Sequence, residues 1–410
     1  MEKRLSTDPY KGVRDFYPED QAQEQYFFGV WRRVAESFGY VEYGASPLEP
    51  SELYEAKSSQ EIVAEQTYTF EDRGKRRVTL RPEMTPTLAR MVAGRRRELP
   101  LPLRWFSIPN VFRYERPQRG RLREHWQLNC DLFGVAGVEA EVELISLASA
   151  ILRAFGAMEG DFEFRVNDRE ALEKLFAEQG IEGEKARAMR RLLDKRDKME
   201  NFDELAEKLL GKPFNIHAIQ DAAVSALIER LAAAGIGNVR HDPSLVRGFD
   251  YYTGIVFEVF DTAPENNRSL FGGGRYDNLL EVFGAEKLPA AGFGMGDVTL
   301  RDFLESRKLL PAYRSPTELL LCTIGDEAAS FAYALAEALR AQELRVAVDP
   351  TERKIGDKIK TANKQRIPFI VALGADEMHS GSFTLKELAS GAEVAVGRAD
   401  IASFIKAKRA

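Results

Sequence analysis

The sequence predicts an α+β domain, made of an antiparallel sheet flanked by helices, with a helical insertion and a C-terminal α/β domain. Three observations predict this fold. Residues 105–134 read as two strands around a basic loop, and the second strand alternates apolar and polar side chains. Residues 165–240 are richly charged and follow a helical period. From Pro316 onward strands and helices alternate, which indicates βαβ units and a mostly parallel sheet.

Length and composition restrict the possible classes of protein. A chain of 410 residues is too long for one ordinary core, and its 44% hydrophobic and 30% charged residues are typical of a globular protein. No apolar run approaches the roughly 20 residues that cross a bilayer, and the N-terminus lacks a secretory signal. The distant Cys130 and Cys322 are expected to be reduced thiols of a cytoplasmic protein, and with four histidines they form no pattern for a protein-ligated metal. A net charge of −6 argues against nonspecific coating of nucleic acid.

The first elements along the chain are a helix and a strand–helix unit. Residues 21–40 are expected to form an amphipathic helix that ends at Gly39, followed by an extended segment that Pro47 interrupts. Residues 78–94 read as a strand that enters a helix, with Thr85 as the natural N-cap. Glu83 and Thr85 therefore lie at the exposed lip where the strand becomes a helix.

The strand after the basic loop has two different faces. Apolar side chains occupy one face: Trp126, Leu128, Cys130 and Leu132. Polar side chains occupy the other: Gln127, Asn129 and Asp131. Because successive side chains of a strand point to opposite faces, Gln127 and Asp131 point the same way. If the apolar face is core, the polar face lines a cavity or contacts solvent.

The rest of the chain divides by composition. Residues 139–157 form a long apolar-periodic helix, and 242–260 return to strand character. A proline-punctuated boundary lies near 310–316. The expected domains are the α+β domain over 1–164 and 241–312, the helical insertion over 165–240 and the α/β domain over 316–410.

Arginines are concentrated in the basic loop, within the eleven residues from 113 to 123: Arg113, Arg116, Arg119, Arg121 and Arg123. Arg113 stands inside an apolar strand, where an unpaired guanidinium is costly, so it needs an anionic partner. Glu115 is one such partner and a bound phosphate or carboxylate is the other. Arg247, in LVRGFDYY, is embedded in the same way, next to a glycine that allows close approach.

These cations and a set of acidic and hydroxyl groups suggest one pocket. The acids and polar partners are Glu83, Gln127, Asp131, Tyr251 and Tyr252. No GxxxxGK[ST] loop occurs in the chain, so a polyphosphate would be held by arginines instead. Residue chemistry alone predicts activation of a nitrogen-bearing acid by a nucleotide.

Four segments carry a resemblance to a known family. FRYERPQRGRLREHWQLNCDLFG (112–134) resembles motif 2 of class II aminoacyl-tRNA synthetases, in the form typical of the histidyl-tRNA synthetase family. LVRGFDYYTGIVFE (245–258) and RPEMTPTLAR (81–90) resemble substrate-binding segments of that family, and GYVEYGASPLE (39–49) resembles motif 1. The C-terminal α/β unit is similar to the anticodon-binding domain of the same enzymes. The resemblance covers nearly the whole chain except 165–240.

The resemblance implies an activity, its substrates and an oligomeric state. The family forms an adenylate from L-histidine and ATP, releases pyrophosphate, and transfers histidine to the 3′ end of tRNA(His). Mg²⁺ would bridge the leaving phosphates, and the α+β domain would be the class II catalytic domain. The protein would be a cytoplasmic homodimer with Pro47 at the dimer interface.

The resemblance also implies roles for individual residues. Arg113 and Arg247 would be the catalytic cations, in contact with both histidine and the α-phosphate. The ATP-binding residues would be Arg113, Arg121, Arg123, His125 and Arg247. The histidine-binding residues would be Glu83, Thr85, Arg113, Gln127, Asp131, Arg247, Tyr251, Tyr252 and Tyr276. Contacts to tRNA would come from Arg116, Arg119, Arg353, Lys354, Lys358 and Lys360.

One motif departs from the family pattern. Motif 3 usually has G-x-G-x-E-R at a helix start, whereas GFGMGDVTL places Val298 and Thr299 at the glutamate and arginine positions. Arg301 faces about 200° around the helix and is a poor substitute. Either another residue such as Arg275 covers the nucleotide, or ATP binding is weakened.

Two other functions compete with this reading. A relative of the synthetases that has lost the chemistry, of the ATP phosphoribosyltransferase regulatory type, senses histidine without charging tRNA, and the altered motif 3 agrees with it. The intact LVRGFDYY and the appended anticodon-type domain oppose it. A plain nucleotide-binding or scaffolding protein would not need the acid–tyrosine pocket.

Overall fold

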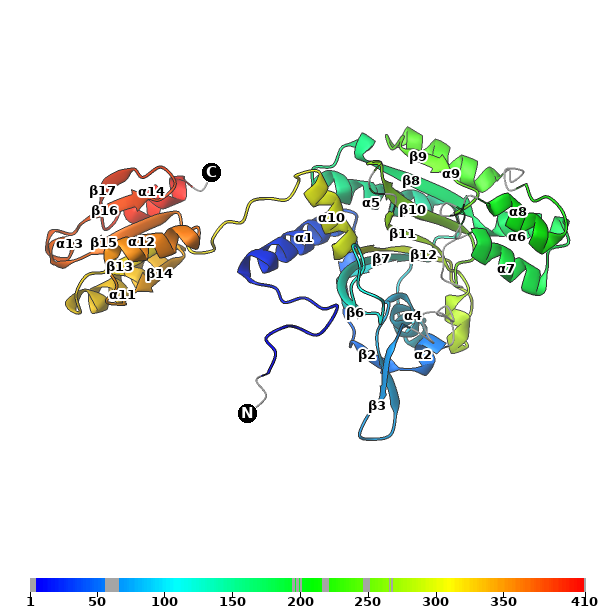
Figure 1. Cartoon of the computed structure of the whole chain (residues 1–410), viewed down its shortest axis with the longest axis horizontal. Helices are drawn as coiled ribbons and strands as arrows, with labels where there is room; N and C mark the ends of the chain where they lie inside the picture. Colours follow the sequence, from blue (N-terminus) through cyan, green and yellow to red (C-terminus); the bar gives the residue numbers. More distant parts are fainter. Residues whose placement is uncertain are drawn as a thin grey trace. The chain divides into compact units, whose positions relative to one another are not determined.

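The computed structural model describes residues 5–55, 66–193, 196, 199, 201–215, 221–245, 251–264, 266 and 268–408. The chain divides into two compact units, Met1–Pro311 and Ala312–Ala410, which are each described by themselves (Figure 1). Within the described residues, no helix is long and apolar enough to span a bilayer.

The larger unit is organised around one main sheet. Its strands, in order across the sheet, are β1 (Val41–Glu42), β5 (Leu103–Ser107), β7 (Glu124–Phe133), β12 (Ala290–Gly296), β11 (Ser269–Arg275), β10 (Ile255–Asp261), β8 (Phe162–Asp168) and β9 (Val239–His241). The short β6 (Asn110–Phe112) also pairs with β7. Every pairing is antiparallel except β1–β5 and β8–β9 at the two edges. The predicted antiparallel sheet with flanking helices is confirmed.

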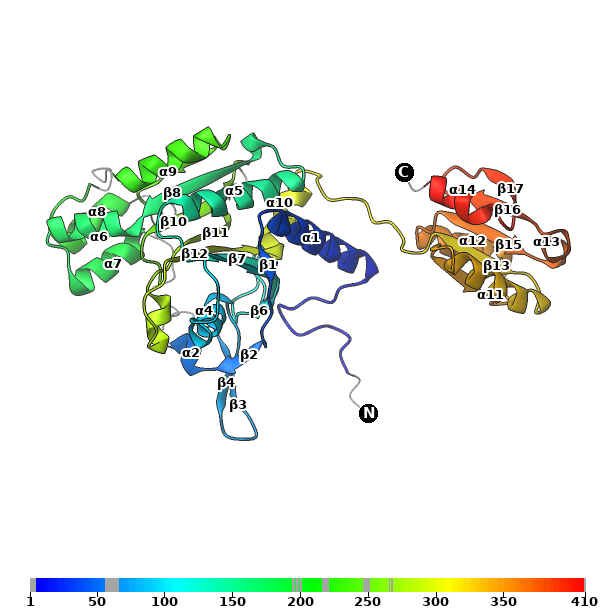
Figure 2. The ribbon, with the colours of Figure 1, turned by 180° about the vertical axis from the view of Figure 1, so that it is seen from behind.

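Helices cover the apolar face of this sheet. They are α1 (Pro18–Ser37), α5 (Glu139–Ala154), α9 (Ala222–Ala233) and α10 (Asp297–Ser306), and α1 and α5 lie side by side (Figure 2). The apolar face of β7 packs beneath them, with Leu128, Cys130 and Leu132 fully buried beside Trp31 of α1. Burial on this scale is the main driving force for folding.

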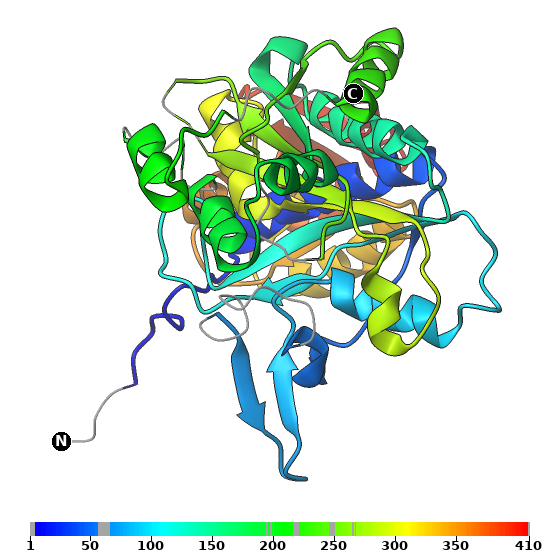
Figure 3. The same cartoon turned by 90° about the vertical axis from the view of Figure 1, so that its right-hand side faces the viewer.

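A smaller group of elements lies against the polar face. It contains the sheet β2 (Leu48–Pro50), β4 (Arg77–Leu80) and β3 (Tyr68–Glu71), with α2 (Glu52–Glu55), α4 (Thr85–Gly94) and the short helix η4 (Leu279–Phe283). The β3–β4 hairpin projects from the rest of the unit (Figure 3). Since Leu88 and Val92 of α4 share a core with Phe133 of β7, α4 is fixed against the face that carries Gln127 and Asp131.

The structure corrects the predicted limits of the helical insertion. Its first residues belong to β8 in the main sheet, after the turn η1 (Glu159–Asp161). The helices α6 (Arg169–Glu178), α7 (Gly183–Leu193) and α8 (Phe202–Leu210) share a core of their own. By contrast, α9 contributes Val224, Leu227 and Leu231 to the core of the main sheet. Periodicity identified these helices, but it does not say which core each of them joins.

The smaller unit is an α/β domain, as predicted. Its elements in chain order are β13 (Leu319–Thr323), α11 (Glu327–Arg340), β14 (Val346–Asp349), α12 (Ile355–Lys364), β15 (Phe369–Leu373), α13 (Ala375–Ser380), β16 (Ser382–Glu387), β17 (Glu393–Gly397) and α14 (Ile401–Ala407). The sheet order is β14-β13-β15-β16-β17, parallel over the first three strands. The last two strands form an antiparallel hairpin.

Candidate active site

A pocket opens on the polar face of the main sheet. Its lining residues are Glu83, Thr85, Arg113, Gln127, Asn129, Tyr251, Tyr252, Gly272, Tyr276, Gly292, Phe293 and Gly294. Seven of the nine predicted histidine-binding residues are among them. An eighth, Asp131, lies directly behind Tyr276, whose hydroxyl donates to its Oδ1. The ninth, Arg247, lies outside the described residues.

Glycines form the floor of this pocket, and the sequence analysis did not assign them to the site. Gly272 and Gly294 face each other across β11 and β12. A Cβ on Gly292 would overlap the carboxylate of Asp131, and a Cβ on Gly294 would overlap the amide of Gln127. Strand glycines of this kind mark a place where another group approaches closely. The signal was present in the consecutive glycines of GGGR and the alternating glycines of GFGMG.

Asp131 supplies an acceptor at the inner end of the pocket. Its side chain is buried, and burial raises the pKa of this carboxyl to about 7, against the hydrogen bond from Tyr276, which lowers it. Within the described part of the chain, Oδ2 of Asp131 and Oε1 of Gln127 have no hydrogen-bond partner. A buried acceptor without a partner is costly, so these atoms suit a ligand that donates N–H groups.

Glu83 places a second carboxylate at the start of α4. It is buried, and the hydroxyl of Tyr251 donates to Glu83 Oε2 over 2.8 Å. Burial and the neighbouring Glu83 raise the pKa of Tyr251 well above its usual value, so the phenol stays protonated as a donor. The helix begins at Thr85 itself, with Met84 as the N-cap, one residue earlier than predicted.

Arg113 follows β6 and borders the same pocket. Its Nε donates to the carbonyl oxygen of Pro82 over 2.8 Å, which fixes the edge of the guanidinium. The alternative partner Glu115 is instead paired with Arg121, at 3.3 Å. His125, at the start of β7, is partly buried, and desolvation together with Arg113 and Arg14 lowers its imidazole pKa to about 3. The ring is therefore neutral near pH 7.

Arg123, for which a phosphate-binding role was predicted, makes structural contacts in this structure. Its side chain is only 9% exposed. Nε donates to the carbonyl of Glu115, Nη1 donates to the hydroxyl of Tyr10, and the guanidinium lies 4.0 Å from the centre of the Tyr114 ring. The backbone N–H of Arg123 also donates to the carbonyl of Gly12. Arg123 thus connects the N-terminal segment to the basic loop, and its side chain is enclosed between them.

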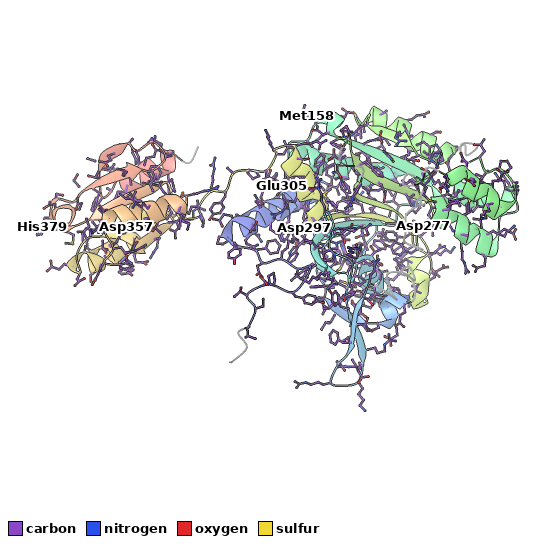
Figure 4. The ribbon with its side chains drawn as sticks, viewed as in Figure 1. Met158, Asp277, Asp297, Glu305, Asp357 and His379 are labelled. Atoms are coloured by element: carbon purple, nitrogen blue, oxygen red, sulfur yellow. The ribbon has the colours of Figure 1, made fainter. Side chains whose placement is uncertain are left out.

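The unusual motif 3 residues have structural roles. Asp297, labelled in Figure 4, is fully buried and accepts from Arg14 at 2.6 Å and from the backbone of Trp126. The hydroxyl of Thr299 donates to the carbonyl of Leu270 over 2.6 Å. Arg301 points toward Glu24 of α1, at 3.8 Å, so it cannot replace the missing arginine.

Arg275 does not replace it either. Its Nε and Nη2 each donate to the buried carboxylate of Glu141 over 2.8 Å. Nη1 and Nη2 also reach the carbonyls of Val135 and Gly137. A guanidinium satisfied in this way is a structural connection between β11 and α5, not a nucleotide-binding group.

The residues predicted to contact tRNA differ in exposure. Arg116, Lys354 and Lys360 are exposed, and Arg353 is exposed but paired with Asp349 at 2.8 Å. Arg119 is paired with Asp302 at 2.9 Å. Lys358 was wrongly predicted, because its side chain is fully buried and donates to the carbonyls of Thr323 and Asp349, each over 2.9 Å.

Lys358 is instead expected to stabilise the smaller unit. Replacing it with methionine should destabilise this unit by roughly 2–3 kcal/mol, because two buried carbonyl groups lose charge-assisted hydrogen bonds. Hydrogen exchange of the β13 and β14 amides in the full chain measures the effect. Lys360→Met, on the exposed side of the same helix, is the control, and equal losses in the two variants would contradict the assignment.

Pro47 is exposed and directly precedes β2, and the apolar side chains of Val41 and Leu48 are exposed as well. Its backbone carbonyl accepts from Arg81. Among the described residues, no group of three or more His, Cys, Asp and Glu side chains is arranged to hold a metal ion. Both cysteines are free and buried.

Comparison with known proteins identifies close relatives. A family model described as histidyl-tRNA synthetase matches residues 12–197 and 163–298, and one described as anticodon binding domain matches 318–408. The chain is 42% identical to the histidine–tRNA ligase of Leptospira biflexa serovar Patoc, over 95% of each chain. These matches account for both units.

Solved structures share the fold. The crystal structure of histidyl-tRNA synthetase from Nostoc sp. PCC 7120 covers 99% of this chain and 100% of its own, with a TM-score of 0.79 at 24% identity. An ATP phosphoribosyltransferase regulatory subunit/histidyl-tRNA synthetase from Bacillus halodurans C covers 88% of this chain and 98% of its own, with a TM-score of 0.70 at 24% identity. At this identity both matches concern the fold alone.

Proposed function

Because the chain belongs to the histidyl-tRNA synthetase family, a family of ligases, we propose that its Glu83–Asp131 pocket forms histidyl-adenylate. The observation that carries this proposal is a pair of buried carboxylates, Glu83 in the pocket lining and Asp131 behind Tyr276, with Arg113 beside the same pocket. Histidine has an amino group and a carboxylate on Cα at one end and a ring N–H at the other. The charges of the pocket complement those of this amino acid.

Histidine would be oriented by hydrogen bonds at both ends. Glu83, with Tyr251 and Thr85 beside it, is the acceptor for the α-amino group. Asp131 accepts the imidazole N–H through its unpartnered Oδ2, while Tyr276 holds the other oxygen. An amino acid without this N–H would leave the buried acceptor unpaired, and such sites discriminate by as much as ~10⁴–10⁵.

The reaction would be an in-line displacement at the α-phosphorus of ATP. A histidine carboxylate oxygen forms the new P–O bond, the bond to the β-phosphate oxygen breaks, and pyrophosphate leaves. No general base is needed, because the carboxylate is already ionised. ATP enters with Mg²⁺ on its phosphates as part of the substrate. Positioning and charge stabilisation supply the acceleration, through Arg113 and, by family resemblance, Arg247.

The second step would transfer histidine to the 3′ end of tRNA(His). The smaller unit is proposed to hold the anticodon region, and its match to an anticodon-binding family supports this role. A homodimer with Pro47 at its interface is proposed from motif 1 and from the exposed Val41 and Leu48. The free, buried cysteines support a cytosolic location.

The deciding test is histidine-dependent exchange between ATP and pyrophosphate, followed by charging of tRNA(His). Exchange and charging are both expected. No exchange at saturating histidine would exclude the synthetase and favour the regulatory alternative, whose representative shares the fold over 88% of this chain. Exchange without charging would exclude only the tRNA step.

Exposed lysines of the smaller unit give a separate prediction for tRNA binding. Lys354→Gln with Lys360→Gln should raise KM for tRNA about 3- to 10-fold and leave pyrophosphate exchange unchanged. The slope of log KM against log salt should fall by about 2, roughly 1 for each lost phosphate contact. Lys406→Gln with Lys408→Gln, at the C-terminal end of α14 in the same unit, is the control. An unchanged slope in the first double variant would show that α12 does not contact RNA.

A further inference from the structure

A second pocket of about 280 Å³ lies at one end of β11, next to the histidine pocket. Its lining residues come from three places: the tip of the basic loop (Arg119 and Gly120), the start of β11 with the residues before it (Asn266, Arg268, Ser269 and Leu270), and the first two turns of α10 (Thr299 and Asp302). Leu270 precedes Gly272 of the histidine pocket by two residues of one strand, or about 7 Å.

His125 of β7 lies beside the neighbouring strand β12, which runs from the histidine pocket toward Thr299. A Cβ on Gly296 would lie 3.7 Å from the His125 ring and 3.9 Å from the hydroxyl of Thr299. Gly294, two residues earlier on β12, belongs to the histidine pocket. The proposed adenine-stacking residue therefore lies between the histidine pocket and Thr299.

The second pocket carries an excess positive charge. Arg119 is paired with Asp302, through Nε at 2.9 and 3.0 Å and through Nη2 at 2.9 Å. Arg268 is exposed and donates from Nη1 to the carbonyl of Arg119, and no carboxylate among the described residues pairs with it. A guanidinium held at a pocket wall without a carboxylate is suited to bind a phosphate.

The position of Thr299 explains why the positive charge of this pocket comes from Arg268, which directly precedes β11. Thr299 occupies the place of the motif 3 arginine, and its side chain lines the pocket. The threonine side chain is short and uncharged, and its hydroxyl already donates to the carbonyl of Leu270. Gly120 lies between the two sides, where a Cβ would be 3.6 Å from Thr299 and 3.8 Å from Arg268 Nη1. Arg268 thus reaches the same space from the opposite wall.

We infer that this pocket binds the phosphate end of ATP and that Arg268 supplies the positive charge that Thr299 lacks. The inference rests on the proposed function, and it deepens it by assigning a nucleotide-binding residue outside the family motifs. Arg268 acts as a binding residue for the leaving pyrophosphate. Arg119 and Asp302 position the loop tip and contribute no net charge.

Arg268→Gln tests this assignment, because glutamine keeps a donor for the Arg119 carbonyl and removes the charge. In histidine-dependent exchange, KM for ATP should rise about tenfold or more, and KM for histidine should stay within about twofold. Adding Thr299→Arg to Arg268→Gln should recover most of the loss, since the new guanidinium enters the same pocket. Arg97→Gln, an exposed arginine beyond α4, is the matched control.

Three results would overturn the inference: an ATP KM within about twofold of the unaltered chain, an equal rise in KM for histidine, or a rise in KM for tRNA instead. Because Arg268 is exposed, the thermal midpoint should not change, and a lower midpoint would indicate a structural role. Absence of exchange in the unaltered chain would count against the proposed function only. Calorimetric titration of ATP into both chains would still show whether Arg268 binds the nucleotide.

Discussion

Replacing Arg113 with glutamine is expected to lower the kcat of histidine-dependent pyrophosphate exchange by at least ~100-fold, the usual scale for losing one charge-stabilising group. The Pro82 carbonyl fixes Nε of Arg113, so its remaining N–H groups are oriented before the substrates arrive. Glutamine is polar but uncharged, and it cannot compensate the charge that develops around the α-phosphorus.

The matched control for this variant is Arg116→Gln. Arg116 lies three residues further along the basic loop and is exposed, so exchange should change less than about twofold. Circular dichroism and the thermal midpoint should be unchanged in both variants. If Arg113→Gln kept more than about a tenth of the parent rate, the mechanism would be wrong even though the family assignment stands.

Asp131→Asn is expected to lower kcat/KM for histidine about 10- to 100-fold, because a hydrogen bond to a charged group is replaced by a neutral one. Asparagine has nearly the same shape and still accepts from Tyr276, so KM for ATP should not change. Steady-state exchange with histidine and ATP varied separately measures the two effects. An equal loss for both substrates would indicate that the pocket had rearranged.

The pH dependence of the same position has a defined sign. Burial raises the Asp131 pKa from 3.8 to about 7, so the carboxyl becomes protonated as pH falls through 7. KM for histidine should therefore rise below pH 7 in the unaltered chain, beyond the change seen in Asp131→Asn, which lacks this titration. The variant also serves as the control for titration of free histidine itself.

Folding stability should fall as pH rises, whereas histidine binding should improve. Since the unfolded carboxyl ionises near 3.8 and the folded one near 7, the unaltered chain loses stability as pH rises between these values. Asparagine has no charged form. Raising the pH from 5 to 8 should therefore lower the thermal midpoint of the unaltered chain relative to that of Asp131→Asn. A difference that did not vary with pH would contradict the raised pKa.

The sequence was informative where a local period decides the structure. The two faces of β7 follow from the alternation of side chains along a strand, so Gln127 and Asp131 were placed on one face correctly. The lip at Glu83 and Thr85 follows from a strand that enters a helix. The tyrosines came from a family segment whose order in the chain is specific.

The sequence does not show the environment that distant parts of the chain make around a residue. Arg123 and Lys358 look like any exposed cation in the sequence. In the fold, Arg123 donates to the hydroxyl of Tyr10 and Lys358 is buried with a hydrogen bond to the carbonyl of Thr323. The sequence leaves Arg275 available to bind the nucleotide, whereas in the fold it is paired with Glu141 of α5. Arg268 has no motif around it, and only the fold brings it opposite Thr299.

The N-terminal segment has a consequence for the order of events during synthesis. Tyr10 bonds to Arg123, 113 residues later, and Arg14 bonds to Asp297, 283 residues later. Tyr10 can meet Arg123 early, whereas Arg14 cannot meet Asp297 until the chain extends through residue 297. Contacts of such long sequence separation slow folding. The hydrogen bond from Arg14 to Asp297 therefore forms only when nearly the whole larger unit has been made.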